Sequence, residues 1–196
     1  MLSNIVNKLV SFNNPNIDCQ LNYAQKISQV PAKRRAIILD ILELYQCRPK
    51  NHYFDHYCED AIFEDPIVSA FNREEIRSQF VMMPQVLSRS KTLKFNILRI
   101  DTHEVVIDLY QWYETFGLRI PVPVRSLVRL VFDSNDKVVY HGDYWYHSAA
   151  FDSMRGIVGF TWKQLRRLNG ATMPYVASLI VAPAERKSIA SHGSGS

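Results

Sequence analysis

The chain has 196 residues, of which 47% are hydrophobic and 12% aromatic, and its formal net charge at pH 7 is +4. This length and apolar content predict one domain with a substantial core, together with tails. Charged residues of both signs are interspersed and no dense basic run suggests a nucleic-acid groove, so we expect no nucleic-acid partner.

The three cysteines, Cys19, Cys47 and Cys58, stand at irregular spacing and form no Cys-x-x-Cys motif. This pattern argues against a disulfide framework and for a reducing compartment, so we expect an intracellular protein, cytoplasmic in the simplest case. Residues 1–12 lack the cationic start and unbroken apolar core of a secretory signal, although their apolar face leaves a mitochondrial presequence as a weaker alternative. No apolar run reaches the roughly 20 residues that span a bilayer.

The first half of the chain is predicted to be mainly helical. Residues 1–31 have the composition of an irregular arm, and residues 32–46 then place five apolar side chains on one helical face: Ile37, Ile38, Ile41, Leu42 and Tyr45. A second short helix is expected at 51–60, followed by a strand over the sequence AIFED. Asn72 is a suitable cap for a third helix, which Pro84 should stop.

From residue 91 the sequence becomes rich in Val, Ile, Tyr and Trp, in four long segments separated by short turns. Sequential strands with such short links form an antiparallel meander. Helices followed by a meander predict an α+β domain in which a curved sheet wraps around the helices.

Residues 150–182 are predicted to form an amphipathic helical extension, with Asn169-Gly170 as a helix stop and a short apolar segment beyond it. The apolar face either caps the open end of the domain's curved sheet or lies on a membrane surface, with Arg166 and Arg167 toward anionic headgroups. Residues 183–196 should be a disordered tail.

This order of elements resembles the NTF2-like superfamily, the cone fold that ketosteroid isomerase shares with SnoaL-like enzymes. The residues that carry the resemblance are YCEDAIFEDP (57–66), the helix from Arg73 to Phe80, and VFDSNDKV (131–138) leading to Asp143-Tyr-Trp145. It covers residues 33–149, so the domain is expected at 32–149. It implies an α+β cone with N-terminal helices packed in a curved antiparallel sheet, and homodimers formed through that sheet.

Asp65 is the first candidate for a catalytic residue. Pro66 cannot donate to a strand ladder, so strand pairing should end there, with Asp65 at the rim of the cone. In ketosteroid isomerases the aspartate of this Glu-Asp-Pro sequence is the proton-shuttling base, and the resemblance assigns that role to Asp65. The alternative is structural, in which Asp65 accepts backbone N–H groups and shapes the turn.

His141 and Asp143 are the other two catalytic candidates. Strand alternation places His141, Asp143 and Trp145 on one face and the neighbouring tyrosines on the other. A histidine and a carboxylate side by side in the cone could handle protons. Alternatively they form a satisfied polar cluster, and a slip of one residue in register would turn them outward.

The pocket of such a cone should be lined by aromatic side chains, for which the candidates are Tyr57, Phe63, Trp145 and Trp112. Core packing is an equally good explanation for Tyr57, and either Trp112 or its neighbour Tyr113 should face inward. Matched to ketosteroid isomerase, the two oxyanion donors fall at Ile41 and Val128. Neither side chain can donate a hydrogen bond, so steroid isomerisation is disfavoured.

His52 and His56 have the helical spacing of a zinc clasp but lack further ligands, and no phosphate-binding loop occurs, so we expect no metal and no cofactor. The sequence leads to two functional hypotheses. The first is a hydrophobic small-molecule binder for a lipid, sterol or polyketide-like compound, acting in the enzyme case as a cofactor-independent isomerase, cyclase or hydrolase. The second is a non-catalytic dimeric scaffold, with peripheral membrane contact through residues 151–182.

Overall fold

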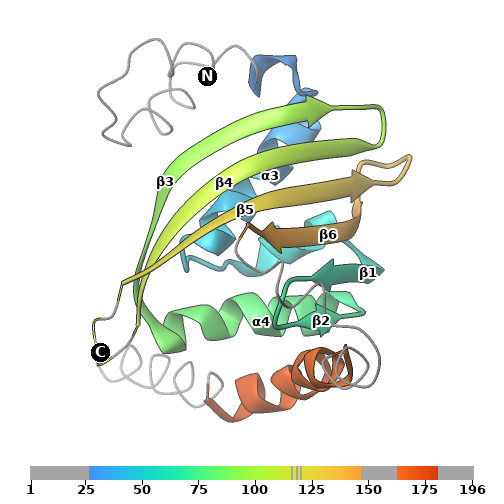
Figure 1. Cartoon of the computed structure of the whole chain (residues 1–196). Coiled ribbons are helices and arrows are strands. Elements are labelled where there is room, and N and C mark those ends of the chain that lie inside the picture. The colour runs from blue at the N-terminus through green and yellow to red at the C-terminus, as the bar shows by residue number, and fades with distance from the viewer. Residues whose placement is uncertain (1–26, 116, 118, 120, 147–162, 181–196) are drawn as a thin grey trace, which may run out of the picture.

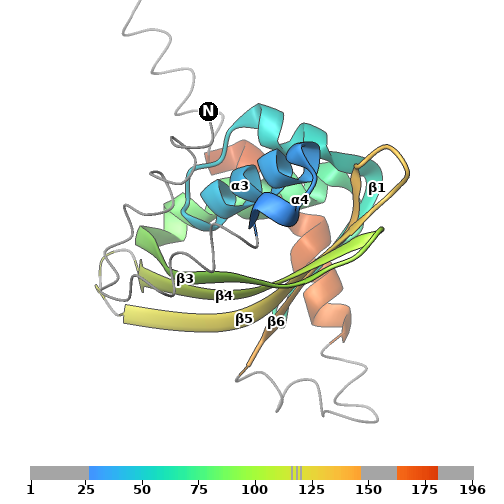
Figure 2. The ribbon, with the colours of Figure 1, turned by 90° about the horizontal axis from the view of Figure 1, so that it is seen from above.

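A computed structural model describes residues 27–115, 117, 119, 121–146 and 163–180. The expected irregular arm as far as residue 26, the start of the C-terminal extension at 147–162, and the expected tail therefore lie outside the described residues. Within them, the expected α+β architecture is confirmed: a curved, unclosed sheet holds helices on its concave side (Figures 1 and 2).

The helix predicted at 32–46 is α3, Ala32–Tyr45, and its buried face includes Ile37, Ile38, Ile41 and Leu44. Ile27 and Val30 are buried beside it. The folded unit therefore begins before residue 32, and the expected arm is shorter than its composition indicated.

The second predicted helix is a 3₁₀ helix, η1, Asn51–His56. It gives way at Tyr57 to strand β1, Tyr57–Glu64, which begins four residues earlier than expected. Tyr57 therefore comes from the strand and not from the helix. The sequence did not predict the first half of this strand because it contains the acidic residues Glu59 and Asp60, which are uncommon in strands.

Helix α4, Arg73–Val86, begins as predicted, because the side chain of Asn72 accepts a hydrogen bond from the Glu75 N–H at 2.9 Å. The prediction that Pro84 stops the helix is wrong, since α4 continues through it to Val86. Proline removes only one backbone hydrogen bond so close to the helix end, and Leu87 N still donates to Met83 O beyond it.

The predicted antiparallel meander is confirmed as four strands: β3 Leu87–Ile100, β4 Glu104–Thr115, β5 Pro121–Phe132 and β6 Val138–Trp145. Strand β1 adds to this meander in parallel with β6, and the short β2, Ser69–Ala70, pairs with β1. The sheet order is therefore β2-β1-β6-β5-β4-β3. The parallel pair sets Phe63 opposite His141.

The two faces of the sheet differ in chemistry. The concave face packs apolar side chains against α3, among them Ile97, Ile107, Leu109, Val128 and Leu130. On the convex face, buried Glu104 pairs with Arg99 and Arg129, and buried Asp108 accepts two bonds from Arg125 at 3.1 and 3.2 Å. A network of ion pairs therefore covers the centre of the convex face.

Residues 163–180 form one helix, which lies beside α4 and β2, away from strands β3–β5 (Figure 1). The predicted stop at Asn169-Gly170 is wrong. Gly170 serves close packing instead, because a Cβ atom at this position would lie 2.0 Å from the carbonyl oxygen of Ser69. No helix among the described residues is long and apolar enough to cross a membrane.

The two arginines of this helix face the domain. Arg167 donates to both carboxylate oxygens of Glu75, at 2.7 and 2.9 Å, and lies over the ring of Phe71. Arg166 donates to Val68 O at 3.3 Å. Both arginines therefore contact protein groups in this docked helix, which does not support the alternative in which they lie toward anionic headgroups.

Candidate active site

Asp65 lies directly after β1, in a tight turn that its own side chain stabilises. The Asp65 Oδ1 atom accepts hydrogen bonds from the backbone N–H groups of Ile67 at 2.7 Å and Val68 at 2.6 Å. Pro66 between them fixes the backbone and cannot compete as a donor. The structural role considered for Asp65 is therefore present, but it uses only one oxygen. Asp65 Oδ2 has no hydrogen-bond partner among the described residues.

The carboxyl group of Asp65 titrates near neutrality. Burial, with a smaller contribution from the negative charge of Asp143, raises its pKa to about 7 against the opposing effects of the two backbone N–H groups and Arg166. A carboxyl group in this range accepts and returns a proton readily at physiological pH.

Asp143 lies on the concave face of β6, buried at 6% exposure. Burial raises its pKa to about 6, and the hydroxyl groups of Ser126 and Tyr45 and the Trp145 N–H oppose this rise. Trp145 Nε1 donates to Asp143 Oδ2 at 3.2 Å, whereas the buried Oδ1 has no hydrogen-bond partner within the described chain. An unsatisfied buried oxygen is costly and unusual, and it is a ready acceptor for a bound group.

His141 is completely buried between two tyrosines. Its Nδ1 atom lies 2.9 Å from Tyr57 Oη and its Nε2 atom 3.0 Å from Tyr45 Oη, while the rings of Phe63 and Phe80 pack around the imidazole. Burial lowers the pKa of His141 to about 3, so the ring is neutral at physiological pH. His141 faces inward as alternation predicted, but its partners are hydroxyl groups and not Asp143.

A neutral imidazole has one donor and one acceptor, so one tyrosine hydroxyl accepts a hydrogen bond from His141 and the other donates one to it. The Tyr45 hydroxyl also favours the ionised form of Asp143. His141 therefore positions both Tyr45 and Tyr57.

Tyr45 and Tyr113 are site residues that the sequence did not reveal. Burial raises the pKa of Tyr113, and Asp143 and Asp65 raise it further, so its phenol lies near both acids. No hydrogen bond of the Tyr113 hydroxyl occurs within the described chain. The sequence did offer one signal for Tyr45. It lies one helical turn after Ile41, the position that matches the oxyanion tyrosine of ketosteroid isomerase.

The four predicted pocket-lining aromatics divide between the interior and the surface. Tyr57 and Phe63 are buried around His141, and Trp145 is half-buried beside Asp143. Trp112 lies on the convex face of β4, because its neighbour Tyr113 is the one that faces inward. Trp112 therefore does not line the space around the two acids.

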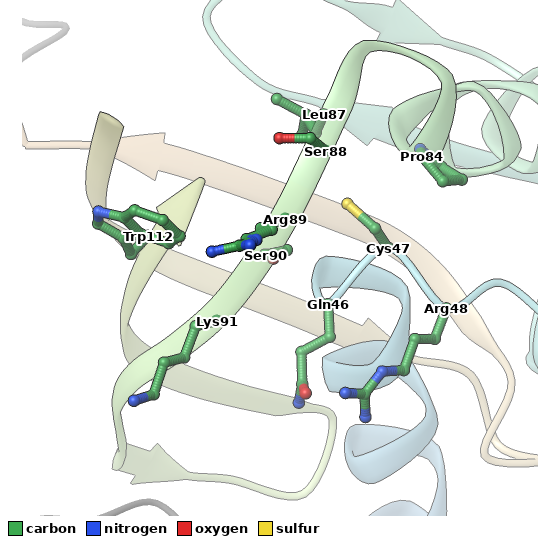
Figure 3. A pocket seen from close by; sticks show the side chains of 10 residues that line it. All are labelled: Gln46, Cys47, Arg48, Pro84, Leu87, Ser88, Arg89, Ser90, Lys91 and Trp112. Atoms are coloured by element: carbon green, nitrogen blue, oxygen red, sulfur yellow. The ribbon is translucent and has the colours of Figure 1, made fainter. Parts of the chain in front are cut away.

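Trp112 lines a separate open groove of about 570 Å³ where the ends of α3 and α4 meet the start of β3 (Figure 3). Asp65, His141 and Asp143 do not line it. The groove carries three cationic side chains, Arg48, Arg89 and Lys91. Its full lining is Gln46, Cys47, Arg48, Pro84, Leu87, Ser88, Arg89, Ser90, Lys91 and Trp112.

The paired histidines of η1 have different surroundings. His56 Nε2 lies 2.8 Å from Asp40 Oδ2, and His52 packs against the Tyr53 ring. Over the ranges that the structure describes, no three His, Cys, Asp or Glu side chains are grouped so that they could hold a metal ion.

No protein-family model matches the sequence, and a comparison with curated proteins finds no match. Solved structures are similar in fold. An NTF2-like protein from Anabaena variabilis is 14% identical, with 57% of this chain and 85% of that chain covered, at a TM-score of 0.50. A protein of ketosteroid isomerase-like fold from Catenulispora acidiphila, in complex with trimethylamine, is also 14% identical (59% and 89% covered, TM-score 0.48). A putative polyketide cyclase from Pseudomonas putida is 8% identical (61% and 96% covered, TM-score 0.49).

Proposed function

Because the chain has the NTF2-like cone fold, we propose that it binds a hydrophobic small molecule within the cone and catalyses a cofactor-independent proton transfer on it. The reaction class is an isomerisation or a cyclisation of a carbonyl compound. The observation that carries this proposal is the convergence of two inward acids, Asp65 and Asp143, with pKa values of about 7 and about 6.

Asp65 is the base in this proposal. Its Oδ1 atom is held by two backbone N–H groups, so the carboxylate has a fixed direction, and Oδ2 is available to take a proton from a carbon next to a ligand carbonyl. The C–H electron pair moves into an enolate, and Asp65 later returns the proton to a different carbon. No oxidant or external acid is needed.

Tyr113 is the group that stabilises the developing oxyanion. Burial keeps Tyr113 protonated, so its hydroxyl can donate to the oxyanion. Asp143 has the lower pKa of the two acids, so it is the acid that stays charged, and its charge raises the pKa of Asp65. His141 makes its hydrogen bonds with Tyr57 and Tyr45 and serves to orient Tyr45.

The dimeric scaffold is the second hypothesis, and the structure gives it less support. Association through the sheet needs an apolar convex face, but the ion pairs of Glu104 and Asp108 lie on that face. The acids of the concave face would also have no role in a scaffold.

The test combines ligand detection with isotope exchange. Native mass spectrometry of the purified full chain should show a retained hydrophobic molecule, and hydrophobic ketones added in D₂O should gain deuterium next to the carbonyl. Asp65→Asn should slow this exchange by about 10²–10⁴-fold. Glu64→Gln, which changes the neighbouring carboxylate, is the control and should retain the rate. Exchange that persists in Asp65→Asn, or the absence of any bound ketone, would overturn the proposal.

A further inference from the structure

The helix at residues 163–180, which continues through Pro174, exposes an apolar stripe. Leu165, Leu168, Tyr175 and Leu179 are 57%, 58%, 70% and 57% exposed, with exposed Thr172 between them. Counted with Thr172, these positions are separated by three, four, three and four residues. This is the heptad spacing of a helix that packs lengthwise against another helix. Single exposed apolar residues are ordinary, but a continuous row is not.

The opposite side of this helix is already committed to the domain. Gly170 and Ala177, seven residues apart, are both buried, and Arg167 is fixed by Glu75. The helix therefore cannot rotate to bury its stripe against α4 without losing these contacts. Whatever covers the stripe must come from outside the described part of the chain.

The borders of the stripe suit a second copy of the same helix. One border consists of Gln164, Ala171 and Ser178, which recur every seven residues and are exposed and uncharged. Two of these are small, so a facing helix can approach closely. Residues 168–180 contain no charged side chain, and identical surfaces can therefore meet without like charges opposing each other.

A lipid surface fits these borders less well. Interfacial helices carry cationic side chains along the polar flank, where they reach anionic headgroups. Arg166 and Arg167 are instead engaged by Val68 and Glu75. Only Lys163, at the edge of the described helix, remains as an exposed cation on this segment.

We propose that the stripe is a self-association surface through which two copies of the chain form a dimer. The stripe is nearly symmetric about Thr172, with Leu165 and Leu179 seven residues to either side. In an antiparallel pair, Leu165 of one copy lies opposite Leu179 of the other, and Leu168 lies opposite Tyr175. Such a two-fold contact is closed and stops at the dimer. The stripe includes none of the residues of the concave site.

Sedimentation velocity of the full chain over a wide concentration range tests this surface. The wild type should show a monomer–dimer equilibrium, and the double variant Leu168→Glu/Tyr175→Glu should be monomeric, with a dissociation constant at least 100-fold higher than that of the wild type. Leu98→Glu places the same charge on an exposed leucine of β3 and should leave the dimer intact. Thermal melts check that all variants remain folded, as expected because the substituted side chains are exposed.

Three outcomes would overturn the proposal: a wild type that is monomeric at every concentration, a dimer that survives in the double variant, or a dimer lost in Leu98→Glu. The last would place association on the sheet. Flotation with phosphatidylcholine vesicles and with vesicles that also contain phosphatidylserine is the companion measurement. A monomeric wild type that floats, and a double variant that does not, would assign the stripe to a lipid surface. Because no ligand is used, failure here leaves the proton-transfer proposal untouched.

Discussion

At the level of single residues, His141 acts as a neutral connector between two hydroxyl groups. Its ring is surrounded by Tyr45, Tyr57, Phe63 and Phe80, which exclude the water that a charged imidazole would need. A neutral ring has one donor and one acceptor, which is what the chain from Tyr57 to Tyr45 requires.

Replacing His141 with leucine should destabilise the fold. The substitution leaves the buried hydroxyls of Tyr57 and Tyr45 without this partner, so the free energy of unfolding should fall by about 2–4 kcal/mol. Urea unfolding measures the change. The triple variant that also carries Tyr57→Phe and Tyr45→Phe removes the stranded hydroxyls and should be less affected than His141→Leu alone. If the triple variant instead lost as much stability as the three single substitutions added together, this account would be contradicted.

Asp143 should make stability depend on pH. Its folded pKa of about 6 lies above the unfolded value of 3.8, so the folded state holds the proton more tightly, and stability is lost as pH rises from about 4 to about 6. Asp143→Asn should remove this loss, which is at most about 3 kcal/mol. Relative to the wild type, the variant should become more stable from pH 4 to pH 7 in urea unfolding.

The contribution of His141 has the opposite sign, but it is present in both proteins and cancels in their difference. Asp60→Asn removes an exposed carboxylate and is the control, with no change in relative stability over the same pH range expected. If the free energies of unfolding of Asp143→Asn and wild type differed by the same amount at every pH, burial would not raise the pKa of Asp143.

The sequence predicted part of this site because strand alternation is local. It places His141 and Asp143 on one face of β6, and both are buried there. It did not predict their partners, since Tyr45 reaches β6 only through the packing of α3 on the sheet. It also left Trp112 and Tyr113 undecided, because a strand with aromatic residues at successive positions has no clear polar face.

At the level of elements, the helix at 163–180 reinforces the turn that carries Asp65. Asn169 Nδ2 donates to Ile67 O at 3.0 Å, and Arg166 donates to Val68 O at 3.3 Å. The N–H groups of the same two residues hold Asp65 Oδ1. The C-terminal extension thus fixes the peptide groups that orient the candidate base, and the charge of Arg166 lowers the pKa of Asp65.

Gly170→Ala should loosen this helix although alanine favours helix formation by about 1 kcal/mol over glycine. The added Cβ atom would lie 2.0 Å from Ser69 O, so the helix must move away, and overpacking of this kind costs about 1–3 kcal/mol. Hydrogen exchange should be faster across 163–180 and in the Asp65 turn. Ser178→Ala, an exposed position on the same helix, should leave exchange unchanged. A more protected helix in Gly170→Ala would contradict the close packing.

The elements that local signals predicted correctly are those with a strong period or cap: α3, the start of α4 and the four strands of the meander. Two of the errors concern residues that break isolated helices. Pro84 lies so close to the end of α4 that it removes only one backbone hydrogen bond, and close packing against Ser69 requires Gly170.

At the scale of the whole molecule, the C-terminal helix at 163–180 lies between the concave site and the apolar stripe. One side of that helix holds the Asp65 turn, and the other carries the stripe. The cone itself was predictable from helices followed by a meander with short links. The parallel pairing of β1 with β6 was not, since no local pattern reports which distant strands become neighbours.

The parallel pairing of β1 with β6 has a consequence for folding during synthesis. Tyr57 and His141 are 84 positions apart, and β1 has no neighbour in the sheet other than β2 until β6 arrives. Closing so long a loop is an entropic cost that early local structure cannot offset. During synthesis Asp65 and Asp143 therefore come together only after most of the domain has left the ribosome. The concave site is thus among the last parts of the domain to form.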